Sequence, residues 1–182
     1  MKRALAGIAV LLATTTFALG CGKERWPVKV GMDQDAANVS LFPIETTIAE
    51  LGNIAALHNP DAQKRARYPT ELNTYTVHGI LTVIKHESDE DYHLVIAEPD
   101  DREITMIVES PALDCAQGSP FENRIDIVRQ EIADQLGAIT RKRHPNIPVT
   151  VTGVAFFDKL HGQEGVAPNG IELHPILNIS FH

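Results

Sequence analysis

Hydrophobic and polar residues alternate over five short stretches of the chain, the pattern that predicts half-buried β-strands. The stretches span residues 75–83, 92–96, 104–108, 149–157 and 171–179. Only short turns rich in Asp and Glu separate the first three, so these are expected to form a three-stranded meander.

A helix is predicted between the third and fourth of these strands. Its apolar residues recur at intervals of three and four and form one stripe, which consists of Phe121, Ile125, Val128, Ile132, Leu136 and Ile139. Ser119 is the expected N-cap, because Pro120 suits the first helical position and Glu122 completes a capping box. Gly137 is expected to end or kink the helix, and the basic run 141–143 suits its C-terminus.

The order of three strands, one helix and two strands predicts a mainly β fold with one helix, a small five-stranded OB-like barrel over residues 70–182. Gly79 and Gly153 fall in the middle of predicted strands, where a tightly curved barrel needs a bend or a close approach of two backbones. An open α+β sheet with the helix on one face is the alternative.

Residues 21–69 show no sustained periodicity and are predicted to form a tether with one short helix. Thr47 and Glu50 have the spacing of a capping box, apolar residues follow at roughly helical intervals, and Pro60 closes the segment.

The first 20 residues predict a secretory signal peptide. Lys2 and Arg3 precede an apolar stretch over residues 4–13, which is shorter than a membrane-spanning helix. We therefore expect an exported protein that faces the periplasm or the cell surface.

Cys21 directly follows this signal. The sequence Ala18-Leu19-Gly20-Cys21 resembles the lipobox of bacterial lipoproteins, in which the cysteine is acylated and becomes the mature N-terminus. The resemblance implies a lipid anchor at Cys21 and the membrane as a partner. If cleavage instead leaves Cys21 unmodified, a disulfide with Cys115, the other cysteine of the chain, is the expected alternative.

The composition argues against a nucleic-acid partner. The 24 Asp and Glu residues outnumber the 16 Lys and Arg residues, and the net charge of -8 repels phosphate backbones. The sequence also lacks the motifs of serine hydrolases and phosphate-binding loops.

Much of the chain resembles a widespread group of exported bacterial proteins to which no activity is attached. The similar stretches are residues 91–96, 105–109, 151–158, 161–163 and 165–175. The last of these, which ends in Gly170-Ile171-Glu172-Leu173-His174-Pro175, is the most specific. The resemblance runs from about Arg67 to Ile179 and implies secretion and a single domain.

The segment from Asp158 to His174 is the main candidate for a functional site. It gathers six polar side chains, which are Asp158, His161, Gln163, Asn169, Glu172 and His174. In an OB barrel this loop joins the last two strands and lies at the usual ligand face. His161, Glu172 and His174 could ligate a divalent metal ion. The alternative is that the loop residues only shape turns.

The acidic turns are a second candidate site, for calcium. Their carboxylates come from Glu87, Asp89, Glu90, Asp91, Glu98, Asp100, Asp101 and Glu103. Surface runs of acidic residues are usually only solvated, and this spacing is not that of an EF-hand loop. His78 and His93 fall on the polar phase of their strands, where they could share a face with His174, but three exposed histidines are the simpler expectation.

Two functions follow from these patterns. The first is a lipid-anchored binding module for a small molecule, a glycan or a protein, since an OB barrel without a nucleophile motif suits binding. The second is a hydrolase of phosphoester or related bonds with a divalent metal ion as cofactor. In both, the loop 158–169 and its flank to His174 are expected to be the working surface.

Overall fold

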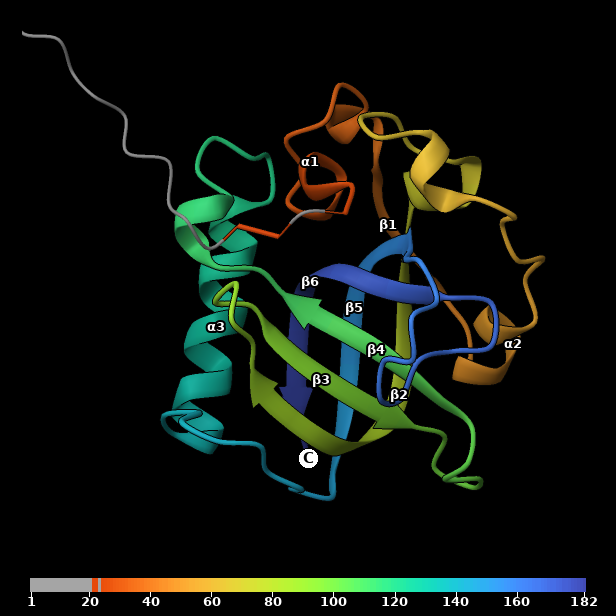
Figure 1. The fold of residues 1–182 in the computed structure, drawn as a ribbon. Coiled ribbons are helices and arrows are strands. Elements are labelled where there is room, and N and C mark those ends of the chain that lie inside the picture. Colours follow the sequence, from red (N-terminus) through yellow and green to blue (C-terminus); the bar gives the residue numbers. More distant parts are fainter. Residues whose placement is uncertain (1–20, 23) are drawn as a thin grey trace, which may run out of the picture.

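Five strands close into a barrel in the computed structural model, which describes residues 21–22 and 24–182 (Figure 1). The predicted signal peptide lies outside these residues. The barrel strands are β2 (Asn73–His86), β3 (Tyr92–Ala97), β4 (Thr105–Ser110), β5 (Ile147–Phe157) and β6 (Ile171–Phe181). All five coincide with the strands predicted from alternation.

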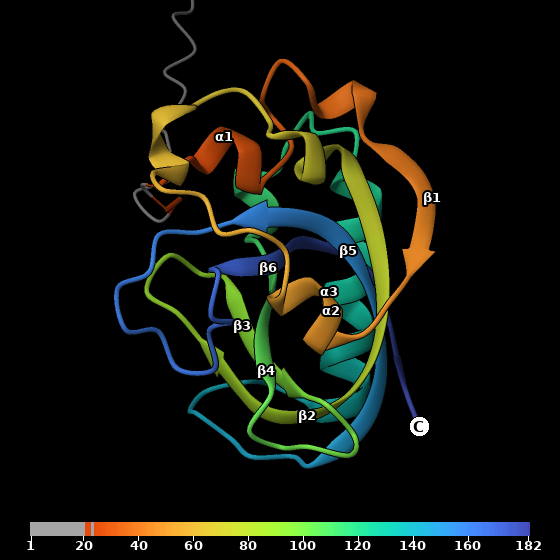
Figure 2. The same cartoon turned by 90° about the vertical axis from the view of Figure 1, so that its right-hand side faces the viewer.

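The strands pair in the order β2-β3-β4-β6-β5, and β2 also pairs with β5, which closes the ring. All these pairs are antiparallel except β4 with β6, which run parallel. Figure 2 shows the long strands β2 and β5 curving side by side along one flank of the barrel. The structure is therefore a small OB-like barrel with one extra strand, and the open sheet is not formed.

Two hydrophobic clusters stabilise the fold. The larger one fills the barrel with alternate residues of each strand, among them Leu94, Val108 and Leu173, all fully buried. The smaller one lies on the outer face of β5 and β6, where Val154 and Leu177 pack against the start of helix α3 (Glu122–Leu136) and against the N-terminal segment. Both faces of the sheet are thus covered in this region.

The segment 21–69 is packed on the barrel, so the prediction of a tether was wrong. Its elements are α1 (Trp26–Lys29), η1 (Ala36–Asn38), β1 (Ser40–Glu45), α2 (Ile48–Gly52) and η2 (Pro60–Ala62), and η3 (Pro69–Leu72) leads into β2. Val28, Val30 and Leu51 are at most 1% exposed. These apolar residues are spaced irregularly along the sequence, which is why no period revealed them.

The short helix and its capping box are confirmed. The side chain of Thr47 accepts a hydrogen bond from the backbone N–H of Glu50, and the Glu50 carboxylate accepts one from the backbone N–H of Thr47. Strand β1, by contrast, was not predicted. It pairs parallel to β2 at the edge of the sheet and leaves Phe42 89% exposed.

Helix α3 begins two residues later than predicted. The hydroxyl of Ser119 accepts a hydrogen bond from the N–H of Phe121, and the carboxylate of Glu122 accepts one from Gly118. These bonds close a turn before the helix, which then starts at Glu122. It ends at Leu136, directly before Gly137, a residue with a positive φ of 69°.

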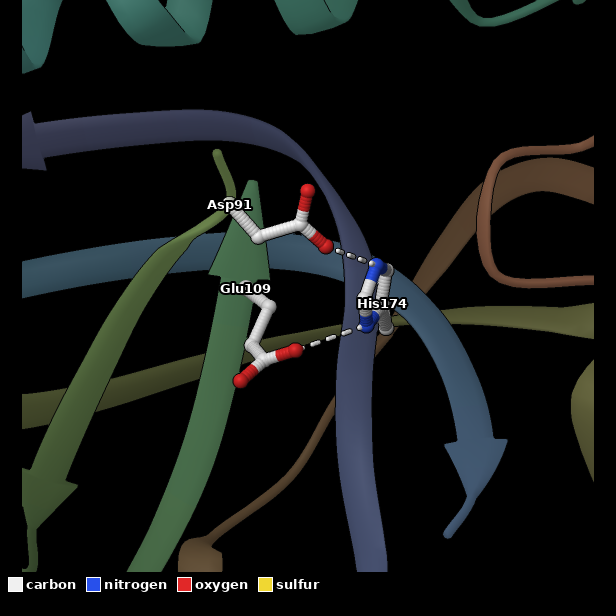
Figure 3. Close-up of side chains that lie close together, drawn as sticks. All are labelled: Asp91, Glu109 and His174. Carbon is white, nitrogen blue, oxygen red and sulfur yellow. Dashed lines mark ion pairs between the residues drawn. The ribbon is translucent and has the colours of Figure 1, made fainter. Parts of the chain in front are cut away.

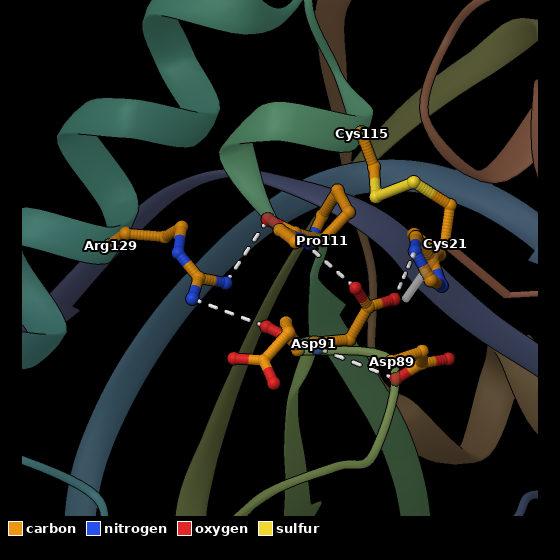
Figure 4. Close-up of a disulfide and its surroundings, with 9 residues drawn as sticks. Cys21, Asp89, Asp91, Pro111, Cys115 and Arg129 are labelled. Carbon is orange, nitrogen blue, oxygen red and sulfur yellow. Dashed lines mark hydrogen bonds and ion pairs between the residues drawn. A yellow bond between two sulfur atoms is a disulfide. The ribbon is translucent and has the colours of Figure 1, made fainter. Parts of the chain in front are cut away.

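Cys21 and Cys115 form a disulfide with their Cα atoms 5.7 Å apart (Figure 4). Of the two outcomes that the sequence left open for Cys21, the structure contains the disulfide. A sulfur atom in a disulfide cannot also carry a thioether-linked lipid, so the expected lipid anchor is incompatible with this structure. Within the described residues, no helix has the length and apolar character that crossing a membrane requires.

Candidate functional site

The two candidate sites of the sequence meet at one end of the barrel. The acidic turn 87–91 joins β2 to β3, and the loop 158–170 joins β5 to β6. These are the two loops that flank the ligand face of an OB barrel. Asp91, at the end of the first loop, lies next to His174, which follows the second loop in β6.

His174 is the centre of this site and is fully buried (Figure 3). Its Nδ1 atom lies 3.1 Å from Glu109 Oε2 and 3.2 Å from Glu172 Oε1. Its Nε2 atom faces Asp91 Oδ2 at 3.8 Å, beyond hydrogen-bond distance, and has no hydrogen-bond partner among the described residues. One edge of the ring is therefore fixed by carboxylates while the other carries an unsatisfied nitrogen.

Glu109 links His174 to a second buried histidine. Its Oε1 atom lies 2.5 Å from Nδ1 of His93, which is its cross-strand neighbour on β3. These side chains point to the outer face of the barrel, since their strand neighbours Leu94 and Val108 fill the interior. His93 and His174 therefore share a polar face, and because both are buried the simpler expectation of exposed histidines was wrong for these two. His78 lies elsewhere, exposed beside Thr150 and Glu45.

The N-terminal segment adds a cation to the same face. Lys29 of α1 places its Nζ atom 3.9 Å from Glu172 and 3.7 Å from Asp158, over the ring of Phe156. Together with Asp91 and Glu109, four carboxylates thus surround one ammonium group and one imidazole. The carboxylates outnumber the two cationic groups, and an excess of negative charge favours a bound cation.

Burial and mutual contact shift the pKa values of this cluster in opposite directions. Burial raises the pKa of Asp91 to about 6 and that of Glu172 to about 7. Burial also opposes ionisation of Glu109, but hydrogen bonds from His174 and His93 outweigh it and hold its pKa well below the usual value. For His174 burial acts to lower the pKa, yet hydrogen bonds to Glu109 and Glu172 raise it to about 9.

The ionised Glu109 fixes the orientation of the His174 ring. A carboxylate is only an acceptor, so Nδ1 carries a hydrogen and Nε2 is the nitrogen that faces Asp91. A carboxylate–histidine pair of this kind orients metal-ligating histidines, whose other nitrogen binds the ion.

Asp91, Glu109 and His174 also satisfy the distance requirement for a metal site. Each offers one ligand atom, and these atoms lie within 4.8 Å of one another. In a tetrahedral site with bonds of about 2.1 Å, neighbouring ligand atoms lie roughly 3.4 Å apart. The 3.8 Å gap between His174 Nε2 and Asp91 Oδ2 needs to close by only a few tenths of an ångström.

The loop residues of the predicted site have structural roles. Gln163 donates hydrogen bonds to the Asp158 carboxylate and to the Lys159 carbonyl, and it accepts one from the N–H of His161. Asn169 is buried and donates to the carbonyls of Leu51 and Ile54 of the N-terminal segment. The two side chains therefore bond backbone, as the alternative for this loop expected.

The predicted metal ligands His161, Glu172 and His174 do not form one group. The side chain of His161 is 56% exposed and lies 4.0 Å from Asp158, whereas His174 is enclosed by Asp91, Glu109 and Glu172. Of the acidic turns, only Asp91 reaches the site; Glu98 instead caps α2 by accepting a hydrogen bond from Ala49.

Sequence reasoning missed Lys29 and Glu109. Glu109 stands as a charged residue at the end of a strand with a buried apolar pattern, a weak signal that was available. Lys29 gave no signal, because its segment was taken for a tether and its partners are far away in sequence.

Comparison with known proteins adds no functional assignment. No model of a protein family matches the sequence, and no curated protein matches it. Among solved structures, a candidate aspartyl-tRNA synthetase from Leishmania major Friedlin is 12% identical with a TM-score of 0.40. The match covers 80% of this chain and 22% of the other, so this chain spans about a fifth of that protein.

Proposed function

We propose that the protein is an exported binding module whose ligand is a divalent metal ion, held by His174 and Asp91 with Glu109 beside them. The observation that carries this proposal is the buried Nε2 atom of His174, which faces the Asp91 carboxylate and has no hydrogen-bond partner among the described residues. An unsatisfied buried polar atom is costly, and a bound ion removes that cost.

The arrangement of the neighbours supports a metal ion at this nitrogen. Glu109 and Glu172 hold the ring through Nδ1 and leave Nε2 as the ligand atom, and Glu109 is itself held by His93. The ion displaces the proton that Nε2 otherwise carries, as metal ions do when they bind histidine. Solvent reaches the site from the side of Asp91 and Glu109, whose side chains are 11% and 12% exposed.

The chemistry of the ligand atoms selects the class of ion. Imidazole nitrogen with carboxylate oxygen suits zinc, manganese and similar transition metals, whereas calcium takes oxygen ligands. The site is therefore expected to prefer Zn²⁺ or Mn²⁺ to Ca²⁺.

Removal of either principal ligand is expected to abolish high-affinity binding. Isothermal titration of the untagged, metal-stripped protein with Zn²⁺ should give one site per chain. The substitutions Asp91→Asn and His174→Gln should each lower the affinity for Zn²⁺ by at least about 100-fold, a loss within the range that ligand deletion causes. Asp91→Asn changes one oxygen to nitrogen and is the less disruptive variant.

His161→Ala is the matched control. His161 was a ligand candidate from the sequence, but it is exposed and lies outside the cluster, so its loss is expected to leave zinc affinity within about twofold and stability within about 0.5 kcal/mol. Wild-type protein without measurable zinc or manganese binding, or equal losses in all three variants, would refute the proposal.

Export is the other part of the proposed function. Its support is the N-terminal signal pattern together with the disulfide, since such bonds persist in oxidising compartments outside the cytosol. Mass spectrometry of the protein from its native host should find a chain beginning at Cys21, two hydrogens lighter than the reduced form and without lipid. A retained residue 1–20 segment would contradict export, and a lipid mass on Cys21 would contradict the disulfide.

A further inference from the structure

The disulfide and the metal-ligand candidate Asp91 belong to the same corner of the molecule (Figure 4). Asp91 Oδ1 accepts a hydrogen bond of 2.9 Å from the backbone N–H of Ala112. Ala112 also begins the turn η4 (Leu113–Cys115), in which the N–H of Cys115 bonds the Ala112 carbonyl at 3.0 Å. The oxygen of Asp91 that faces away from His174 is therefore held by the turn that carries Cys115.

The residue after Cys21, the other half of the disulfide, lies close to the acidic turn. A Cβ atom on Gly22, the neighbour of Cys21, would lie only 3.1 Å from the carboxylate of Asp89. Asp89 in turn accepts a bond of 3.4 Å from the N–H of Asp91. The backbone that follows Cys21 thus lies against the turn that presents Asp91.

Arg129 of α3 holds the same two segments together through hydrogen bonds. Its guanidinium donates to the carbonyls of Ser110 and Pro111 and to that of Glu90, the residue before Asp91. With Arg129 on one side and the disulfide on the other, the segment 110–115 and the turn 87–91 form one connected unit. Movement of either segment moves Asp91.

We infer that the Cys21–Cys115 disulfide is a positioning device for the metal site, so that metal affinity depends on the closed bond. This inference rests on the proposed function. Closure keeps Ala112 in place, Ala112 orients the carboxylate of Asp91, and the Oδ2 atom then faces Nε2 of His174. Opening the disulfide frees the chain at Cys21 and the turn at Cys115. The carboxylate of Asp91 then has to become ordered when the metal ion binds, and the entropy lost in ordering it weakens the affinity for the ion.

The bond can be opened only by a reductant. A dithiol supplies two electrons and two protons, the S–S bond becomes the thiols of Cys21 and Cys115, and the dithiol leaves as its own disulfide. The consequence is that a reducing dithiol should release the metal ion.

The first test removes the disulfide by replacing both cysteines with serine. Chemical reduction is less suitable, because the added thiols would themselves chelate zinc. Zn²⁺ titration of the Cys21→Ser/Cys115→Ser protein should show affinity weakened by at least about tenfold, with the circular dichroism of the barrel retained. Wild-type affinity in this folded variant would overturn the inference while leaving the metal site intact. Failure of the wild-type protein to bind zinc would instead remove the proposed function.

The second test leaves the disulfide closed and covers the case in which the double variant does not fold. Ala112 has φ -56° and ψ 133°, a conformation that proline adopts, so Ala112→Pro removes the N–H that holds Asp91 without requiring another backbone conformation. Zinc affinity should fall by at least about tenfold in this variant, while Ala112→Gly, which keeps the N–H, should stay within about threefold of wild type. Equal affinities of the proline and glycine variants would show that the link through Ala112 does not exist.

Discussion

Replacement of Glu71 by glutamine is expected to lower the free energy of unfolding by about 3–5 kcal/mol, the range for one broken partner of a buried ion pair. Glu71 is fully buried, and its carboxylate accepts bonds of 2.6 and 2.7 Å from the guanidinium of Arg25. It also accepts from the backbone N–H groups of Phe157 and Tyr68. Glutamine presents an NH₂ group where an acceptor is required and leaves the guanidinium without its counter-charge.

The carboxylate of Glu71 links Arg25 of the N-terminal segment to the backbone of Phe157 at the end of β5, so the same substitution should loosen the segment that carries Lys29. Urea unfolding of Glu71→Gln gives the free energy. Glu87→Gln is the matched control, because Glu87 pairs with Lys85 at the surface and such pairs contribute at most about 1 kcal/mol. Equal losses in the two variants would mean that the segment is not anchored by Arg25.

A methyl group added at Gly165 is expected to destabilise the protein by about 3 kcal/mol, through overpacking and an unfavourable backbone conformation. A Cβ atom there would lie 2.2 Å from Cγ1 of Val95, and the φ of Gly165 is +79°. Gly165 lies in the loop 158–170, and Val95 lies on the outer face of β3 beside His93. The loop can cover this face only because position 165 has no side chain.

Gly162 separates the two causes. It has a similar φ of +85°, but a Cβ atom there would have no heavy atom within 4 Å. Gly162→Ala should therefore cost only the conformational part, about 1–2 kcal/mol. Thermal unfolding of both variants measures the two losses of stability. The same measurement on Gly165→Ala combined with Val95→Ala gives the steric contribution at position 165, because the second substitution removes the two side-chain atoms that the new methyl group would meet most closely. If Gly162→Ala and Gly165→Ala were equally destabilising, the loop would not pack on Val95.

Half of the candidate site was predictable. Glu172 and His174 stand on a strand after a long polar loop, and the topology of an OB barrel brings that loop to the ligand face. His161 lies outside the cluster around His174, because proximity in sequence does not fix the direction of a side chain in an irregular loop. Glu109 and Lys29 reach the site across the sheet and from the N-terminal segment.

The sequence by itself determined the five strands, helix α3 and the capping box of α2, because alternation and capping are local patterns that a few neighbouring residues specify. It also contained both cysteines and the N-terminal pattern from which a signal peptide is predicted. Only the tertiary structure decided that residues 21–69 cover the barrel, that Cys21 pairs with Cys115 across 94 residues, and that Asp91 faces His174. Each of these depends on contacts between segments far apart in the chain. Such contacts are selected by shape, burial and charge in three dimensions, and they leave no period in the sequence.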